Sequence, residues 1–174
     1  MSFLSTTDRS GIHAVAQACR DPARVADALT TRNCRWIDVP GAADTRGRVN
    51  FLELGKNLLF QPKRLFWLHH VASGQWRGRH GHRESEELLV AVNGACRAHL
   101  DDGVIKQTVA LDDPARALYV GTWVWHELTD FAPGTAVLVI ASTLYDEAEY
   151  LRDYEVFKRE VGANRAVCGH RSLS

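Results

Sequence analysis

The chain has 174 residues, which suffice for one domain with a sizeable core and are few for two. Its 21 lysine and arginine residues balance 21 aspartate and glutamate residues, so the formal net charge is zero. We therefore expect no partner recruited by bulk electrostatics, such as a nucleic acid or an anionic membrane.

The N-terminal residues carry no basic stretch followed by an apolar run, so we expect no signal peptide. No apolar stretch approaches the roughly 20 residues that span a bilayer. The four cysteines, Cys19, Cys34, Cys96 and Cys168, lie far apart and form no CxxC pair. Free thiols and a cytoplasmic location are the expectation.

Residues 11–30 are rich in alanine, have apolar positions at helical spacing and are interrupted by Asp21-Pro22. Because proline is tolerated only in the first turn of a helix, this pattern predicts two short helices. We divide the chain into a helical N-terminal extension (1–33), a barrel domain with a C-terminal helix (34–162) and a flexible tail (163–174).

From residue 34 to residue 142, short runs of β-branched and aromatic residues alternate with turn signals. Asn93-Gly94 is a hairpin signal, because both residue types accept a positive φ. Candidate strands lie at 34–39, 48–54, 63–71, 87–92, 95–100, 104–110, 116–120 and 136–142. Eight strands at this spacing predict an all-β fold, a jelly-roll barrel or double-stranded β-helix.

Residues 143–162 read as one helix, with acidic residues at its start and Lys158 and Arg159 near its end, which suits the helix dipole. Leu151, Tyr154 and Val161 are candidates for its buried face.

The most informative stretch runs from Gly74 to Gly94 and contains His80, His82 and Glu87 at the spacing of the first cupin motif. Alternation along a strand places His80 and His82 on the same face, which in a barrel can be the lumen. Taken alone, an HxH pair is more often a surface or satisfied core pair. The surrounding glycines and carboxylate favour a functional pair.

A second motif should place a third histidine across the lumen, and His126 stands at that position. The usual proline and glycine of the preceding turn are replaced by Gly121 and Trp123. The second motif is therefore degraded where the first is complete.

Residues 47–160 resemble the cupin-type sugar 3,4-ketoisomerases that act on dTDP-4-keto-6-deoxyglucose, a family that includes the WxcM-like proteins. The resembling segments are Gly55-Lys56, Lys63-Arg64, Arg77 to His82, Val92 to Cys96, Leu100 to Gly103, Val124 to Leu128 and Tyr145 to Phe157. The last segment distinguishes this family from cupins in general.

The resemblance implies a homodimer that exchanges an N-terminal strand, uses no metal or other cofactor and acts on a dTDP-linked keto-deoxysugar. It implies that a keto group moves between C4 and C3 through an enediol, which requires a base and an acid near neutral pH. By match to the family motif, His80 and His82 are the catalytic pair, with His80 as the base.

Four further residues are candidate substrate-binding groups. Arg64 and Arg77 match two arginines of the family, and a guanidinium suits a diphosphate because it binds phosphate in a bidentate way. Either arginine could instead be a solvated rim residue. Trp125 could stack on a base or sugar, or fill the core, and His126 would contact the substrate across the lumen.

Three features depart from the family pattern. The strand that usually carries tyrosines reads Leu65 to Leu68 and has no hydroxyl, so an acid or orienting group is missing or is supplied elsewhere. Glu87 stands where the family commonly has glutamine. The extension of residues 1–33 has no counterpart in the resemblance.

These departures leave two alternatives open. With Glu87, the chain offers His80, His82, Glu87 and His126 as a complete ligand set, which suits iron, manganese, nickel or zinc in a metal-dependent cupin enzyme. The altered strand could also belong to a barrel that binds a sugar nucleotide without converting it.

Overall fold

The computed structural model describes residues 28–170, with side chains described for residues 28–165. The helices predicted within residues 11–30 lie outside this part, apart from residues 28–30, which are irregular. No helix among the described residues is long and apolar enough to cross a membrane.

Strands dominate the described chain. They are β1 (Cys34–Asp38), β2 (Gly41–Asp44), β3 (Gly47–Asn50), β4 (Arg64–His69), β5 (Arg77–His82), β6 (Glu87–Asn93), β7 (Cys96–Asp101), β8 (Lys106–Leu111), β9 (Arg116–Val120), β10 (Trp125–Thr129), β11 (Ala136–Ala141) and β12 (Tyr150–Leu151). A 3-10 helix, η3 (Glu147–Glu149), precedes β12, and the helix α1 (Tyr154–His170) follows it.

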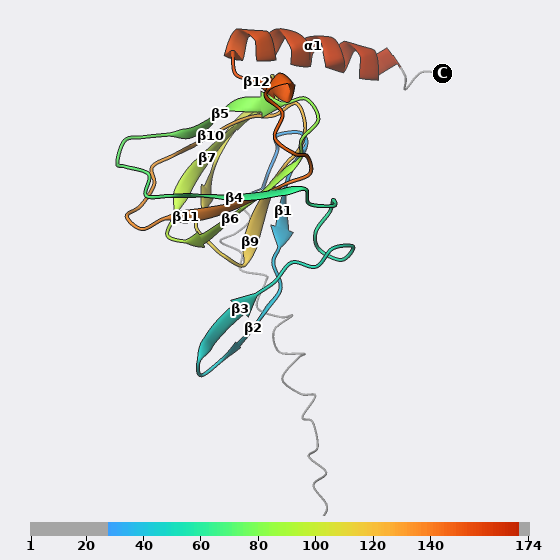
Figure 1. Ribbon diagram of the computed structural model, residues 1–174. Helices are drawn as coiled ribbons and strands as arrows, with labels where there is room; N and C mark the ends of the chain where they lie inside the picture. Colours follow the sequence, from blue (N-terminus) through green and yellow to red (C-terminus); the bar gives the residue numbers. More distant parts are fainter. Residues whose placement is uncertain (1–27, 171–174) are drawn as a thin grey trace, which may run out of the picture.

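Two five-stranded antiparallel sheets form the barrel, in the orders β1-β9-β6-β11-β4 and β12-β5-β10-β7-β8 (Figure 1). Leu118 and Val139 of the first sheet and Leu100 and Leu128 of the second belong to one buried cluster between the sheets. Alternation explains this arrangement, because every second residue of each strand faces the core. The predicted all-β jelly-roll fold is confirmed.

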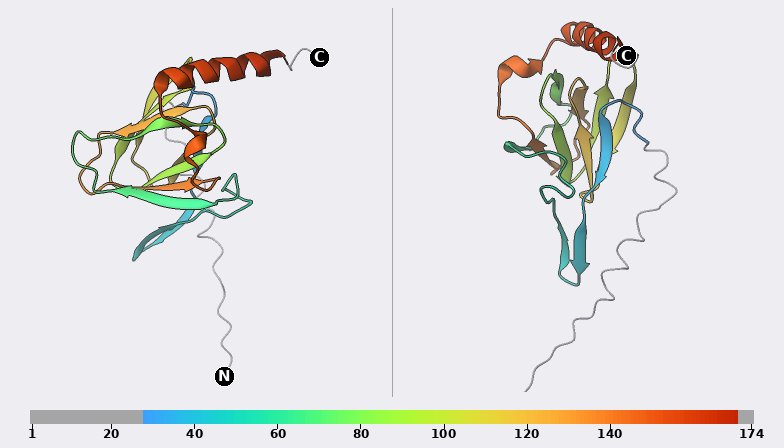
Figure 2. Two further views of the ribbon diagram at one scale, coloured as in Figure 1. Left: turned by 45° about the horizontal axis from the view of Figure 1, so that its top comes forward. Right: turned by 90° about the vertical axis from the view of Figure 1, so that its right-hand side faces the viewer.

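The β2–β3 hairpin stands clear of the barrel, whereas α1 lies across the opposite end (Figures 1 and 2). The strand predicted at 48–54 is therefore wrong in extent, since Gly47–Asn50 forms only one arm of this hairpin. Its other arm, Gly41–Asp44, was not among the candidate strands. The eight candidates did not include β5, because its sequence, RGRHGH, contains no β-branched residue, although the HxH motif within it was interpreted as part of a strand.

Asn93-Gly94 does not close a hairpin, because β6 belongs to the first sheet and β7 to the second. Gly94 adopts the expected positive φ, at 69°. A Cβ atom there would lie 2.5 Å from the Thr135 hydroxyl, so the turn needs glycine for close packing as well. The turn was therefore predicted correctly, but it connects two sheets and does not join two strands of one hairpin.

The single helix predicted at 143–162 is also wrong. Asp146 caps η3 by accepting from the backbone N–H of Ala148, and Asp153 accepts from the first N–H groups of α1. These two caps divide the segment into a 3-10 turn, a short strand and a helix. The helix also continues beyond Gly162 to His170, into the region predicted as a flexible tail.

The packing predicted for this segment holds in part. Leu151 and Val161 are buried, with Phe157 between them in the sequence, and Tyr154 is partly buried against the same cluster. Leu151, however, contributes from β12 rather than from the helix.

Candidate active site

A β-bulge in β5 directs the two histidines of the HxH motif. His80 pairs with His126 of β10, and the register shifts by one residue just after this pair. Gly78 and Arg79 have φ values of 81° and 59°, so the extra residue is accommodated by left-handed backbone. A Cβ at Gly78 would lie 2.9 Å from the His126 carbonyl oxygen, which restricts this position to glycine.

The structure brings His80, His82, Glu87 and His126 together in the lumen, with one ligand atom of each within 4.8 Å of the others. The Nε2 atoms of His80 and His82 are 3.1 Å apart. The two oxygens of Glu87 each lie 3.4 Å from an imidazole, that of His82 and that of His126. Three strands, β5, β6 and β10, therefore aim polar groups at one point.

The environment separates the pKa values of the two HxH histidines. Burial, together with the nearby His126 and His82, lowers the pKa of His80 to about 3. Burial would also lower the pKa of His82, but contacts with Glu87 and Glu149 outweigh it and raise the pKa. Burial would raise the pKa of Glu87, yet the surrounding histidines lower it to about 2. A neutral imidazole beside a readily protonated one is the arrangement of a base and an acid.

Two further residues that contact the histidine pair, and that the sequence analysis did not identify, come from the C-terminal segment. Glu149 Oε1 lies 2.6 Å from His82 Nδ1. The Tyr150 ring lies 4.8 Å and 4.5 Å, between centroids, from the rings of His80 and His82. Both residues belong to the segment from Tyr145 to Phe157, which resembles the family, so they could have been considered as site residues. The prediction of one helix over this segment gave no reason to place them beside His82.

Tyr150 supplies the hydroxyl that is missing from β4. Its hydroxyl accepts a hydrogen bond of 3.1 Å from Arg64 Nη2. Phe66 of β4 lines the same cavity without a hydroxyl, and Trp67 points outward with 64% of its surface exposed. A hydroxyl is therefore present at the cavity, but it comes from β12 of the other sheet.

The lumen cavity has a volume of about 230 Å³. Its lining comprises Phe66, Leu68, Gly78, His80, Glu87, Leu89, His126, Leu128, Val139, Tyr150 and Arg152. Arg64 lies 3.9 Å from Glu87, so this predicted residue belongs to the site. Arg152, which was not predicted, adds a second guanidinium, held at 2.9 Å by Glu147.

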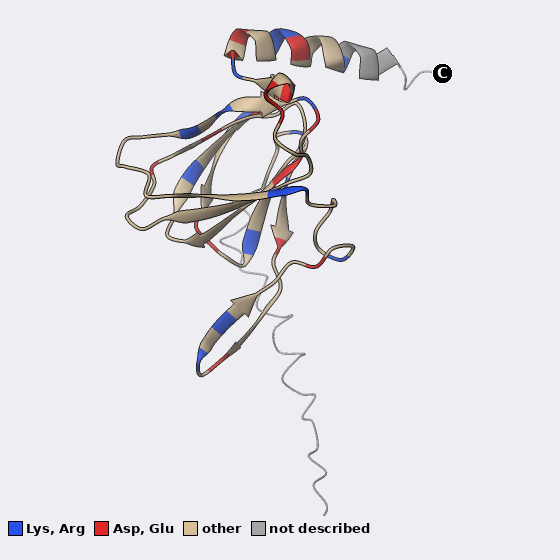
Figure 3. Cartoon of the chain, in the orientation of Figure 1, with Lys and Arg blue, Asp and Glu red and all other residues tan. Residues whose placement is uncertain are grey.

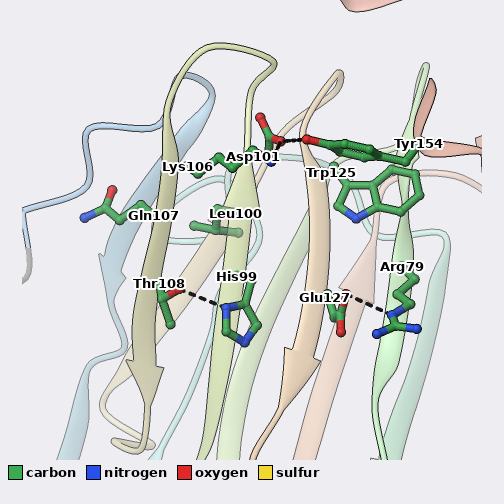
Figure 4. A pocket seen from close by; sticks show the side chains of 10 residues that line it. All are labelled: Arg79, His99, Leu100, Asp101, Lys106, Gln107, Thr108, Trp125, Glu127 and Tyr154. Atoms are coloured by element: carbon green, nitrogen blue, oxygen red, sulfur yellow. Dashed lines mark hydrogen bonds and ion pairs between the residues drawn. The ribbon is translucent and has the colours of Figure 1, made fainter. Parts of the chain in front are cut away.

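The structure does not bring Arg77 or Trp125 to this cavity. Arg77 is exposed, and its guanidinium donates to the Trp76 carbonyl oxygen. Trp125 directly precedes His126 on β10 and therefore faces the opposite side of the sheet, where it packs against Tyr154. There it lines a separate concavity of about 440 Å³ (Figure 4).

The same four lumen groups could hold a metal ion. Three imidazoles and one carboxylate are a donor set for iron, manganese, nickel or zinc. Separations of 3.1 Å and 3.4 Å between donor atoms suit ligands that each lie about 2.1 Å from one ion. Glu87 Oε1 is buried and makes no hydrogen bond in the described structure, although it lies 3.4 Å from His82 Nε2, so its lone pairs remain available to a ligand in the lumen.

The chain is similar to known proteins over most of its length. The family model FdtA, described as WxcM-like, C-terminal, matches residues 32–162. A TDP-4-oxo-6-deoxy-alpha-D-glucose-3,4-oxoisomerase of Aneurinibacillus thermoaerophilus is 43% identical over 118 residues, which cover 68% of this chain and 85% of the relative.

Solved structures of the 3,4-ketoisomerase QdtA of Thermoanaerobacterium thermosaccharolyticum have the same architecture. A double mutant in complex with TDP is 32% identical, with a TM-score of 0.76 over 78% of this chain and 98% of that chain. A mutant in complex with TDP-4-keto-6-deoxyglucose is 30% identical, with a TM-score of 0.74 over 76% of this chain and 96% of that chain.

Proposed function

The chain belongs to the FdtA family of WxcM-like proteins, and we propose that it is an isomerase of deoxysugar biosynthesis. Its reaction moves a keto group between C4 and C3 of a TDP-linked 6-deoxyhexose. The observation that carries the proposal is the 43% identity to a TDP-4-oxo-6-deoxyglucose oxoisomerase. The paired imidazoles in the lumen supply the chemistry that this reaction needs.

We assign the role of base to His80, because its lowered pKa keeps the imidazole unprotonated. It takes the proton from C3, the C3–C4 double bond forms, and the C4 oxygen gains a proton to give the enediol. Return of a proton to C4 and loss of the C3 hydroxyl proton then give the 3-keto sugar. His82, whose pKa is raised, donates the proton to the C4 oxygen. The protonated His80 then returns a proton to C4, and His82 takes the proton lost from the C3 hydroxyl.

Tyr150 and Arg64 support the oxygen atoms in this scheme. Burial raises the pKa of Tyr150, so its hydroxyl remains a donor at neutral pH. Arg64, which donates to that hydroxyl, stabilises negative charge that develops on the C4 oxygen. His126 is buried and its pKa is lowered by that burial, so it serves as a neutral contact for the sugar.

We infer that the diphosphate of the substrate is bound by Arg152, which lines the cavity, since a guanidinium matches phosphate geometry. Acidic and basic residues are interspersed over the barrel and along α1 (Figure 3). Recognition therefore depends on this local cation rather than on a field of one sign.

A homodimer with an exchanged N-terminal element is part of the proposal. The β2–β3 hairpin stands clear of the barrel and carries the exposed Val49, with the half-exposed Phe51 just after it. An apolar groove of about 420 Å³ lies beside the hairpin and includes Val92 and Leu138 of the first sheet. These surfaces suit a second copy of the chain. Light scattering on the wild type and on Val49→Asp would test this assembly.

The test of the activity is an NMR time course with TDP-4-keto-6-deoxyglucose in deuterated water. We expect the 3-keto isomer with deuterium at C4. Exchange at C3 without isomer would indicate an epimerase-like reaction. Saturable binding without exchange would indicate a sugar-nucleotide-binding barrel that does not convert its ligand.

A metal-dependent enzyme is the second candidate, and Glu87 is the observation that favours it. This carboxylate stands where the family commonly has glutamine and completes the donor set of His80, His82 and His126. A bound metal would supply Lewis-acid chemistry in the lumen.

Cobalt binding distinguishes the two candidates. If the enzyme depends on a metal, cobalt bound to the wild type should give a visible absorption spectrum that is lost in Glu87→Gln. Removal of the metal should then also abolish turnover. A chelator-treated wild type that converts the keto-sugar at its full rate would exclude it.

A further inference from the structure

Glu149 is a buried carboxylate outside the set of residues expected from the sequence. Only 7% of its surface is exposed. Its Oε1 atom bonds His82 Nδ1 at 2.6 Å, and its Oε2 atom accepts from the backbone N–H groups of Glu84 and Ser85 at 3.3 Å each. The carboxylate is thus oriented from the loop that directly follows β5.

This geometry determines which nitrogen of His82 carries a proton. An ionised carboxylate can only accept, so His82 Nδ1 must donate to Glu149. The other ring nitrogen, Nε2, then faces the lumen, 3.1 Å from His80 Nε2 and 3.4 Å from Glu87. A carboxylate in this position also prevents the ring from rotating about its χ2 angle.

A second contact holds Glu149 in place. Arg83, the residue after His82, donates to the Ala148 carbonyl oxygen at 2.8 Å and to the Tyr150 carbonyl oxygen at 3.3 Å. The same guanidinium bonds both oxygens of Glu160 on α1, at 3.0 Å and 2.9 Å. The C-terminal segment is therefore fastened beside β5, and with it the carboxylate that reaches His82.

We propose that Glu149 is a positioning residue, which keeps a proton on Nδ1 of His82 before and after proton transfer, so that Nε2 is the atom that gives and takes the proton at the substrate. The inference rests on the proposed isomerase function, which it deepens by assigning the working nitrogen of His82. Its carboxylate reaches the lumen groups through the hydrogen bond to the His82 imidazole, so its effect on turnover is expected to pass through His82.

Glu149→Gln tests the proposal because it keeps the shape of the side chain but replaces an obligatory acceptor with an amide that can also donate. We expect kcat to fall about 10- to 100-fold with KM little changed. Nitrogen-15 NMR of labelled histidine should show His82 protonated at Nδ1 in the wild type, and a changed proton distribution in the variant. Glu155→Gln, the same change at an exposed residue of α1, is the matched control and should leave both readouts unchanged.

Wild-type kcat in Glu149→Gln, or an unprotonated His82 Nδ1 in the wild type, would overturn the proposal. The wild-type spectrum decides the question even if the variant does not fold, and Glu149→Asp, which keeps the charge, should recover part of kcat. If the wild type lacked ketoisomerase activity but His82 was protonated at Nδ1, the proposed function would be wrong. The role of Glu149 in positioning His82 would still hold.

Discussion

The second sheet has a concavity on each face, and the smaller one has the features of an active site. The outer concavity, of about 440 Å³, is lined by charges that are paired with each other, such as Arg79 with Glu127 at 2.9 Å (Figure 4). His99, in the same place, bonds a threonine hydroxyl through each ring nitrogen. In the lumen cavity, of about 230 Å³, His80 Nδ1, Glu87 Oε1 and His126 Nδ1 are buried and make no hydrogen bond with any described residue.

This difference favours the lumen as the active site, because buried polar atoms without a hydrogen bond are a stronger indication of a site than cavity volume is. A buried polar atom without a partner costs free energy, and a fold retains it where a ligand or reaction uses it. Adjacent residues of the same strands supply both faces: Arg79 faces out and His80 faces in. The two faces can therefore be compared by paired substitutions that are one residue apart.

The largest difference in kcat is expected between the variants His80→Asn and Arg79→Ala. Loss of the base should lower kcat by about 10²- to 10⁴-fold, because general base catalysis contributes that much. The outward substitution should change kcat less than about threefold, since surface changes away from the reacting groups have small effects. Turnover of TDP-4-keto-6-deoxyglucose by NMR measures both, and near-wild-type turnover in His80→Asn would refute the lumen assignment.

Tyr150→Phe against Tyr154→Phe is the next comparison. Tyr150 reaches the lumen and Tyr154 lines the outer concavity, where its hydroxyl contacts Asp101. Removal of a hydroxyl that serves a developing charge costs about 1.5–3 kcal/mol, or roughly 10- to 100-fold in kcat. We expect this loss only in Tyr150→Phe, and equal activities for the two variants would contradict the role of the hydroxyl.

The sequence predicted the parts of the site that are local. His80, His82 and Glu87 lie within eight residues, so strand alternation and spacing suffice to bring them together. Trp125 was also predictable, because a neighbour of an inward-facing His126 must face outward, and the substrate-binding interpretation overlooked this. Whether Trp125 binds substrate stays a prediction, but its side chain lies outside the lumen cavity.

The C-terminal contributions could not be predicted in the same way. Glu149 meets His82 across 67 positions of sequence, through the short pairing of β12 with β5. Nothing in the local pattern of residues 147–151 distinguishes a 3-10 turn and a two-residue strand from helix, because both conformations suit an acidic, capped segment. Only tertiary pairing fixes the conformation.

Acid should lower the free energy of unfolding through the buried lumen residue His80 more than through residues of the outer face. The pKa of His80 is about 3 in the folded chain and 6.5 for the free side chain, so between these values the unfolded state binds more protons. Stability is therefore lost as the pH falls below about 6.5, by roughly 2 kcal/mol at pH 5 from this residue. Urea unfolding of chelator-treated protein at pH 7 and pH 5 measures the loss, which should be smaller in His80→Asn. An equal loss in both proteins would show that another group is responsible.

The smallest effect is expected for the ion pair of the outer face. Arg79 and Glu127 are 47% and 20% exposed at their side chains, and Arg79 also lies over the Trp76 ring at 4.1 Å. Exposed pairs contribute about 0–1 kcal/mol, so a double-mutant cycle of Arg79→Ala and Glu127→Ala should give a coupling below about 1 kcal/mol. The cycle separates this pair from the loss of the Trp76 contact, which occurs in both backgrounds that lack Arg79. A coupling of several kcal/mol, or a large fall in kcat, would mean that the outer charges act on the bulge that aims His80, and the two faces would then not be independent.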